Sequence, residues 1–195
     1  MTKVSNYFLD TEFFDPTGDG FSLDFISIGL VAQHGDKEFY GVYDQINDDK
    51  YRGLWLHEHV ISKLPPLEER MSLPQIRQGI LETFESSKPQ SGRRQVDIWA
   101  RNGAYDFFIL CRLFEGMSAL RQTLHQSCKI DRITFRDTKE VIRLLPSLFP
   151  WPEQNENTLH ISIDDARNER DCFNSAMGFL DRRAAAKTSL APEPR

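Results

Sequence analysis

The most informative stretch of this sequence is Tyr7-Phe8-Leu9-Asp10-Thr11-Glu12-Phe13-Phe14. Apolar and aromatic side chains enclose two acidic ones, which is typical of a buried central strand. Side chains two residues apart on a strand point to the same face, so Asp10 and Glu12 are expected to project together. Clustered carboxylates repel one another unless a cation lies between them, and hard divalent cations bind such clusters. The alternative is an ordinary strand whose polar face lies in water.

Outward from this strand, the sequence alternates between strand-like and helix-like segments. Further strands are predicted at 25–33, 38–43, 96–100 and 132–135, and helices at 73–84, 104–113, 138–145 and 162–181. Turn-rich segments at 15–20 and 34–36 suit an antiparallel meander of the first three strands. Three antiparallel strands followed by β-α-β-α-α predict an α/β fold, with a mixed sheet and helices on both faces.

The length and composition indicate one globular domain. The chain has 195 residues, 39% of them hydrophobic, and a net charge of −5, which argues against a broad basic face for duplex nucleic acid. The domain is expected to span 1–183 and to be followed by a disordered tail over 184–195. No apolar run approaches the length needed to cross a bilayer and no signal peptide is apparent, so a cytoplasmic protein without a membrane partner is expected.

The three cysteines and one pair of arginines carry no predicted chemistry. Three cysteines at wide spacing, Cys111, Cys128 and Cys172, favour neither a disulfide framework nor a zinc site. The adjacent Arg93 and Arg94 are interpreted as part of a solvated loop rather than as a phosphate clamp.

Two later segments each place an acidic residue at the start of a predicted helix. Asp106 follows the strand at 96–100, where α/β sheets usually collect ligands. Asp165 begins the last helix, and His160 precedes it by five residues. That offset is not a helical neighbour spacing, so His160 is expected on the loop that enters the helix. Taken singly, each acid could equally be a helix-start residue that complements the helix dipole, and His160 a solvated or capping residue.

Together these segments resemble the three motifs of the DEDD superfamily of 3′–5′ exonucleases. Asp10-Thr11-Glu12 is similar to the first motif, and 102–106 (Asn-Gly-Ala-Tyr-Asp) is similar to the second. His160 with Asp165 resembles the third motif of the His-type branch; the Tyr-type branch would have a tyrosine at position 161, which is Ile161. Within the superfamily, segments 7–13, 23–32, 59–66 and 99–106 are most similar to the bacterial polyadenylate-specific 3′-exoribonuclease AS family.

The resemblance implies a ribonuclease H-like fold and two-metal-ion hydrolysis of phosphodiesters. It implies two Mg²⁺ ions, with Mn²⁺ as a possible substitute, held by Asp10, Glu12, Asp106 and Asp165. Asp10 would bridge both ions, Glu12 and Asp165 would complete one site, and Asp106 would hold the other. His160 would act as the general base, a task suited to a side chain that titrates near neutrality.

The implied substrate is the 3′ end of single-stranded RNA, and the implied product is a nucleoside 5′-monophosphate. Thr11, Phe13 and Trp99 are candidate substrate-binding residues, although core packing is the stronger interpretation of Trp99. The alternatives are a 3′–5′ exodeoxyribonuclease of the same branch, a hydrolase of mononucleotides or short oligomers, and a non-catalytic nucleic-acid-binding module with the same fold. Relatives commonly dimerise, so a homodimer is a further expectation.

Overall fold

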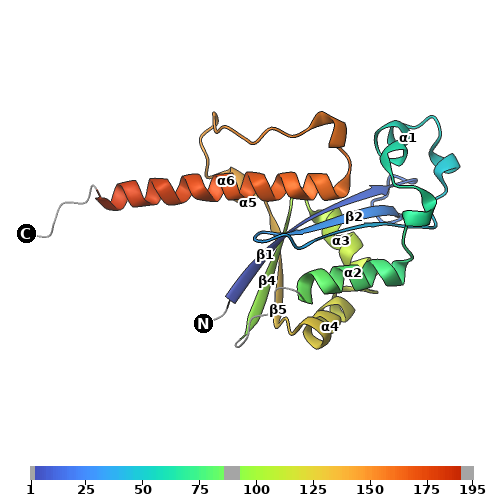
Figure 1. The fold of residues 1–195 in the computed structure, drawn as a ribbon, viewed down its shortest axis with the longest axis horizontal. Coiled ribbons are helices and arrows are strands. Elements are labelled where there is room, and N and C mark those ends of the chain that lie inside the picture. Colours follow the sequence, from blue (N-terminus) through green and yellow to red (C-terminus); the bar gives the residue numbers. More distant parts are fainter. Residues whose placement is uncertain (1–2, 86–92, 190–195) are drawn as a thin grey trace, which may run out of the picture.

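A computed structural model describes residues 3–85 and 93–189, and these form a five-stranded mixed sheet (Figure 1). The strands are β1 (Lys3–Phe14), β2 (Asp24–Ala32), β3 (Glu38–Val42), β4 (Arg94–Ala100) and β5 (Arg132–Asp137). Their order is β3-β2-β1-β4-β5. Strands β1, β2 and β3 pair antiparallel, whereas β4 and β5 run parallel to β1. The predicted α/β class and strand arrangement are confirmed.

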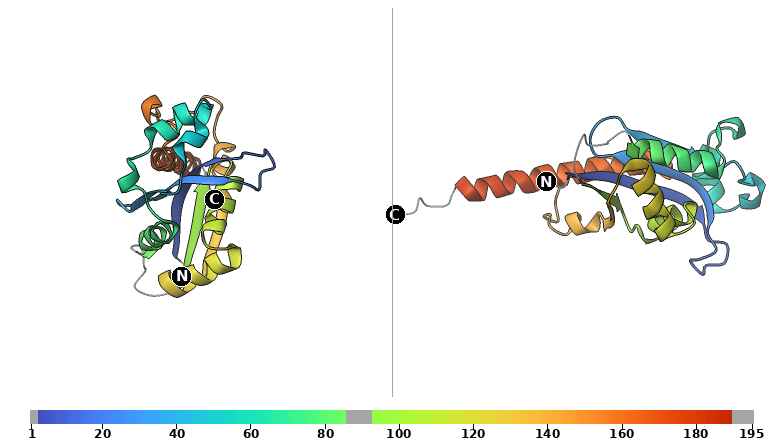
Figure 2. Two further views of the ribbon diagram at one scale, coloured as in Figure 1. Left: turned by 90° about the vertical axis from the view of Figure 1, so that its right-hand side faces the viewer. Right: turned by 90° about the horizontal axis from the view of Figure 1, so that it is seen from below.

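Helices cover both faces of the sheet (Figures 1 and 2). One face carries α2 (Leu73–Glu85), α3 (Ala104–Leu113) and α4 (Met117–Cys128), and the other carries α5 (Lys139–Ile142) and α6 (Ser162–Ser189). The segment between β3 and α2 adds α1 (Trp55–His59) and short 3-10 turns at Asp48–Tyr51, Ile61–Lys63 and Leu67–Glu69; a fourth turn, Glu156–Thr158, precedes α6. No helix within the described residues has an apolar stretch long enough to cross a membrane.

The alternation of side chains along β1 decides which face receives the acids. Tyr7 and Leu9 are buried in the core formed with α2, α3 and α4. Phe8 is buried on the opposite face, against Phe173 of α6. Because Asp10 and Glu12 share the parity of Phe8, they face α6. A bulge in the β1–β2 pairing follows directly at Glu12/Phe13, and it interrupts the regular ladder at this end of the strand.

Helix α6 approaches β2 closely at Gly29, the residue paired with Asp10. A methyl group at position 29 would come within 2.5 Å of Ile163 Cα and closer still to the carbonyl of Ser162. Both Ser27 and Ser162 are fully buried, and their hydroxyl oxygens lie 3.1 Å apart in a hydrogen bond. Glycine is therefore required at position 29, because any side chain would push the start of α6 away from the sheet.

The short helix α1 was not predicted, and three further helices differ from the sequence prediction. Helix α4 was not predicted, although Leu120, Leu124 and Cys128 recur at helical spacing and are buried. Helix α5 ends at Ile142 rather than at residue 145, and the chain continues through tighter turns in which Leu144 donates to Val141 and Leu145 to Ile142. Helix α6 continues to Ser189 rather than ending at residue 181, since its last turns are rich in alanine, the best helix former. The predicted tail boundary at 184 thus lies inside α6, and residues 190–195 lie outside the described part.

The interpretation of Arg94 as a solvated loop residue is wrong. Its side chain is 1% exposed at the start of β4. The guanidinium donates to the carbonyl oxygens of Phe84 (2.7 Å) and Cys128 (3.1 Å) and to the hydroxyl of Tyr7 (3.2 Å). Arg94 thereby satisfies carbonyl groups at the ends of α2 and α4, which is how a buried cation becomes tolerable.

Gly29→Ala should destabilise the protein by about 1–3 kcal/mol, the usual cost of overpacking a tight contact. The matched control is Gly178→Ala in the middle of α6, where the nearest atom to an added methyl is the flexible Arg182 Nη1 at 3.4 Å. That change should be neutral or stabilising by up to about 1 kcal/mol, because alanine is the better helix former. Urea denaturation measures both free energies of unfolding. Equal values for Gly29→Ala and the parent would contradict the close contact.

Candidate active site

The structure brings the five predicted site residues together at one end of the sheet. Asp10 and Glu12 come from β1, Asp106 from the first turn of α3, and His160 and Asp165 from the loop and first turn of α6. Ligand atoms of Glu12, His160 and Asp165 all lie within 4.8 Å of one another. Asp106, Glu12 and Asp165 each act electrostatically on Asp10. Residues far apart in the sequence thus form one acidic cluster.

Asp106 is held in place by the residue between the two acids of β1. Its Oδ1 accepts hydrogen bonds from the backbone N–H of Thr11 at 2.8 Å and from the Thr11 hydroxyl at 2.7 Å. Both side chains are buried, with 6% of Thr11 and 7% of Asp106 exposed. The alternation of β1 therefore serves two purposes: its outer acids face α6 and the intervening threonine anchors α3. The proposed substrate contact of Thr11 gains no support, because its hydroxyl is committed to Asp106.

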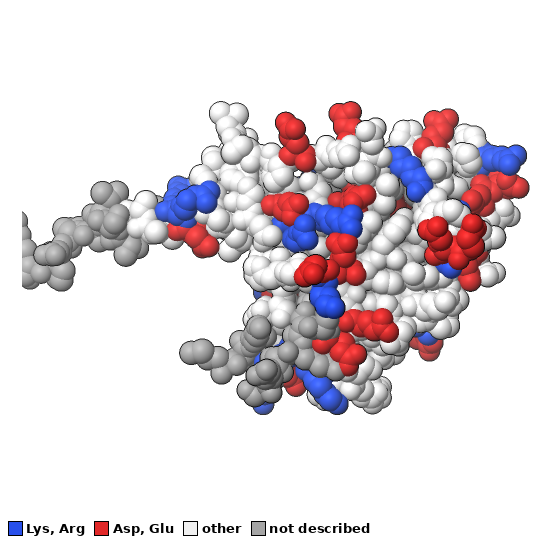
Figure 3. All heavy atoms as spheres, in the orientation of Figure 1, with Lys and Arg blue, Asp and Glu red and all other residues white. Residues whose placement is uncertain are grey.

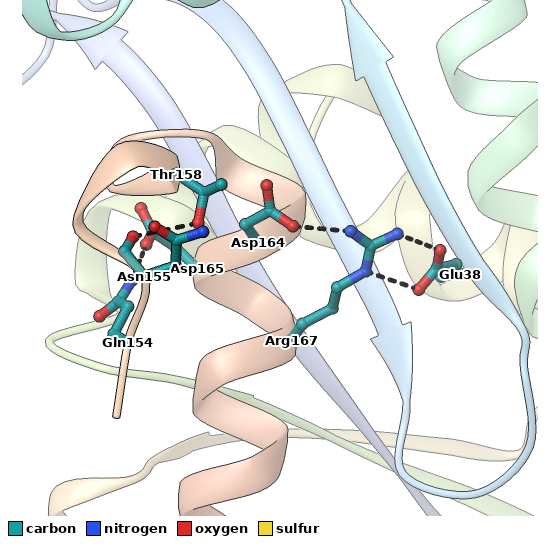
Figure 4. A network of polar contacts seen from close by, with 7 residues as sticks. All are labelled: Glu38, Gln154, Asn155, Thr158, Asp164, Asp165 and Arg167. Atoms are coloured by element: carbon teal, nitrogen blue, oxygen red, sulfur yellow. Dashed lines mark hydrogen bonds and ion pairs between the residues drawn. The ribbon is translucent and has the colours of Figure 1, made fainter. Parts of the chain in front are cut away.

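Asp165 organises the loop that carries His160. Its Oδ2 accepts from the backbone N–H of His160 at 2.9 Å, and its Oδ1 accepts from Gln154 (Figure 4). His160 has a φ of 63°, a left-handed conformation that residues other than glycine rarely adopt. The prediction that His160 lies on the loop entering the helix is confirmed. The hydrogen bond from its backbone N–H holds the main chain of His160 at this place. A ring nitrogen of His160 lies within 4.8 Å of carboxylate oxygens of Glu12 and Asp165.

The start of α6 is also tied to the edge of the sheet (Figure 4). Arg167 Nη1 donates to Asp164 at 2.6 Å, and its Nε donates to Glu38 of β3 at 2.9 Å. Arg167 thus joins the first turn of α6 to β3, and it reinforces the position that the contact at Gly29 sets. Asp164, although adjacent to Asp165, points toward Arg167 rather than into the acidic cluster.

Burial and mutual repulsion raise the pKa values of the clustered acids. Burial is the larger cause for Asp10, whose pKa is raised well above its ordinary value, and the neighbouring carboxylates add to it. The same two causes raise the pKa of Glu12 from 4.5 to about 8, while Lys63 lowers it. Burial also raises the pKa of Asp106 and of Asp165 against their hydrogen bonds. Bound cations would relieve this repulsion, and oxygen donors of this kind suit hard divalent ions.

Comparisons with known proteins agree with this arrangement. No protein-family model matches the chain. Two proteins of Mycobacterium tuberculosis, from strains CDC 1551 and H37Rv, are both named 3′–5′ exoribonuclease. Each is 34% identical to this chain over 163 residues, which cover 84% of this chain and 88% of the relative. The chain belongs to this 3′–5′ exoribonuclease family.

Solved structures of exonuclease I share the fold of this family member. The structure of exonuclease I itself has a TM-score of 0.55 at 14% identity, and its complex titled ExoI/SSB-Ct has a TM-score of 0.53 at 12% identity. Both likenesses cover 93% of this chain but only 44% and 42% of exonuclease I, so the chain spans less than half its length. At this identity the likeness shows the fold alone, and it confirms the predicted ribonuclease H-like architecture.

One further acid of this exoribonuclease family member lies near the cluster and was not predicted from the sequence. Glu169 lies one helical turn after Asp165 and is 7% exposed. Its carboxylate accepts from the Thr138 hydroxyl at 2.9 Å and pairs with Arg101 Nε at 2.8 Å. Its charge contributes to the raised pKa of Asp10. The spacing of four residues from Asp165 was the available signal, since it places both acids on one face of the helix.

The two aromatic candidates for substrate binding differ in their surroundings. Trp99 is 8% exposed; its ring packs on Phe173 at 4.8 Å and its Nε1 donates to Asn6 at 3.0 Å. The ring thus belongs to the core beneath α6, as the stronger interpretation of Trp99 predicted, and base stacking by Trp99 gains no support. Phe13 is half-buried against Tyr105, with ring centroids 5.4 Å apart, and Tyr105 is exposed next to Asp106. Phe13 stays a candidate.

Glu12→Gln should stabilise the metal-free protein at pH 9 and leave it unchanged at pH 4. The raised pKa means that folding favours the protonated acid. That contribution is complete below the ordinary pKa of 4.5 and is lost as pH rises through about 8. Glutamine cannot ionise, so the variant escapes the loss. In EDTA at pH 9, we expect a melting temperature higher by at least about 2–4 °C, the equivalent of about 1 kcal/mol.

The matched control for this measurement is Glu68→Gln, which changes an exposed glutamate outside the cluster. Its melting temperature should follow that of the parent at both pH values. Adding Mg²⁺ at pH 9 should stabilise the parent more than Glu12→Gln, because the variant lacks one anionic ligand. If the melting temperatures of Glu12→Gln and the parent are equal at pH 9, the ionised Glu12 carboxylate does not destabilise the folded protein.

Proposed function

We propose that this protein is a 3′–5′ exoribonuclease of the His-type branch that removes nucleoside 5′-monophosphates from the 3′ ends of single-stranded RNA. The observation that carries the proposal is the meeting of four carboxylates and one histidine at one site, in a chain of the 3′–5′ exoribonuclease family. A module that only bound RNA would not need to bury four mutually repelling acids. The similarity of segments 7–13 and 59–66 supports the AS family within this branch.

Asp10, Glu12, Asp106 and Asp165 are proposed to bind Mg²⁺, with Mn²⁺ as a substitute. When bound, such ions neutralise charge on the reacting phosphodiester and make water a better nucleophile. The four acids fit this task because their oxygens are hard donors. Burial raises the pKa of each of them, and neighbouring carboxylates raise those of Asp10 and Glu12 further. His160 accepts the proton of the attacking water at a ring nitrogen. Its ring already lies beside Glu12 and Asp165, where that water would be held.

The mixed surface charge suits binding of a single-stranded substrate at its 3′ end rather than along its length. On the face shown in Figure 3, Lys and Arg side chains are interspersed with Asp and Glu side chains. With a net charge of −5, the protein is not built to attract long duplexes by a basic face. The positive charge that a 3′-terminal phosphodiester requires is instead supplied locally, by cations held in the acidic cluster.

The function is tested with 5′-labelled single-stranded RNA and DNA of equal sequence, each with Mg²⁺, Mn²⁺ or EDTA. We expect a ladder of 3′-shortened products on RNA with either metal and intact RNA in EDTA. Faster shortening of DNA would make the protein an exodeoxyribonuclease, because the 2′-hydroxyl distinguishes the two substrates. The absence of metal-dependent shortening on both strands would overturn the proposed function.

Substitutions at the site test the individual roles. Asp10→Asn, Asp106→Asn and Asp165→Asn should abolish turnover, since each removes an anionic ligand at constant size. His160→Ala should lower kcat by about 10²–10⁴-fold, the usual contribution of a general base. The matched control is Asp171→Asn, an exposed acid further along α6, which should retain parental activity. Full activity in any of the four site variants would refute the role assigned to that residue.

A further inference from the structure

Three aromatic rings from two distant segments meet beside the acidic cluster. Trp55 and His59 of α1 stack face to face, with ring centroids 4.2 Å apart and an interplanar angle of 8°. The edge-to-face partner of Trp55 is His160, at 4.9 Å and 80°. His59 Nδ1 also lies 2.9 Å from the carbonyl oxygen of Trp55, so α1 holds the stacked pair together independently of the loop. The Trp55 indole therefore contacts His160 as part of a stacked pair that α1 holds in place.

The position of Trp55 is not explained by burial. Its side chain is 57% exposed, whereas the neighbouring Leu56 is buried with Tyr51 and Ile26 and anchors α1 to the sheet. An exposed tryptophan gains little from the hydrophobic effect. What the indole does contact is the imidazole of His160, in an orientation that aromatic pairs favour.

The backbone and the ring of His160 are held by different groups. The backbone is fixed by the hydrogen bond from His160 N to Asp165, and by Lys63 Nζ, which donates to the Leu159 carbonyl at 2.6 Å. Among the described residues, the rings packed against the imidazole are those of Trp55 and His59. Backbone hydrogen bonds do not set the side-chain torsion angles, so the orientation of the ring depends on these aromatic contacts.

We propose that Trp55 is a positioning residue that holds the His160 imidazole against Glu12 and Asp165. The inference rests on the proposed function, in which His160 accepts a proton. The ring of Trp55 contacts the imidazole of His160, and Trp55 acts through that contact. A general base must lie within hydrogen-bonding reach of the proton it removes, and a small displacement costs a large factor in rate. The rival role for an exposed tryptophan at this place is stacking on a nucleobase, which would act through substrate binding instead.

The test compares kcat and KM of Trp55→Ala, Trp55→Phe and the parent on single-stranded RNA, with single-turnover kinetics for slow variants. Trp55→Ala should lower kcat by about 10–10²-fold and change KM by less than about twofold. Trp55→Phe should keep most of the parental kcat, because a phenyl ring can restore the edge-to-face contact. Leu67→Ala, a change of an exposed apolar residue in the same segment, should behave as the parent.

Trp55→Ala in the His160→Ala background distinguishes positioning of His160 from stacking on a nucleobase. A residue that acts through His160 has nothing left to position there, so Trp55→Ala should lower kcat by less than about twofold further. An equal loss in both backgrounds, or a raised KM with parental kcat, would overturn the proposal in favour of nucleobase stacking. Parental kcat in Trp55→Ala, while His160→Ala is impaired, would overturn it outright.

Ring order measured by NMR on the His160 imidazole needs no turnover. The ring should be ordered in the parent and in Trp55→Phe, and motionally averaged in Trp55→Ala. Unchanged order in Trp55→Ala would refute the positioning role even if the enzyme is active. If the ring loses order in Trp55→Ala but the parent has no nuclease activity, the positioning contact would stand. The proposed function would then be the part that is wrong.

Discussion

The contact between Gly29 and the backbone of Ser162 and Ile163 is the constraint on which the site depends. Gly29 pairs with Asp10 across β1 and β2, and Ser162 begins the turn of α6 that carries Asp165. The absence of a side chain at one position therefore sets the separation between the acids of the sheet and the acid of the helix. The buried hydrogen bond between Ser27 and Ser162 fixes the helix along the strand. Rigid elements rather than loops thus position the four acids, which is what a precise site requires.

Close approach of the acids opposes folding, and the structure compensates it only in part. Asp106 accepts two hydrogen bonds from Thr11, and Glu169 is paired with Arg101 and Thr138. The pKa values of the cluster nevertheless remain raised. The acids that destabilise the metal-free fold are the ones that a bound cation would stabilise most. Metal affinity and the free energy of unfolding therefore depend on the same repulsion between carboxylates.

The sequence was sufficient for the fold class, the five strands and the five candidate site residues, because these follow from local patterns and from the resemblance of the three motifs. Alternation along 7–14 predicted a buried strand with two acids on one face, and the offset of His160 predicted its loop. Features that depend on tertiary contacts were out of reach. The sequence around Arg94 indicates a loop residue, because the carbonyl acceptors that bury its guanidinium come from the distant helices α2 and α4. Trp55 carries no local signal of its contact with His160, since about a hundred residues separate them in the chain.

Asp165 performs two tasks that compete for the same oxygens. As a proposed ligand it must direct an oxygen toward a cation, yet Oδ2 accepts from the His160 backbone and Oδ1 accepts from Gln154. A carboxylate oxygen has more than one lone pair, so it can accept a hydrogen bond and bind a cation at the same time. For Asp165 this requires that the loop keeps its present geometry. The left-handed backbone of His160 is tolerated because this hydrogen bond overdetermines it. Binding of a cation at Asp165 would thereby be coupled to the backbone of His160, because the carboxylate proposed to bind the metal also holds the main chain of the proposed base.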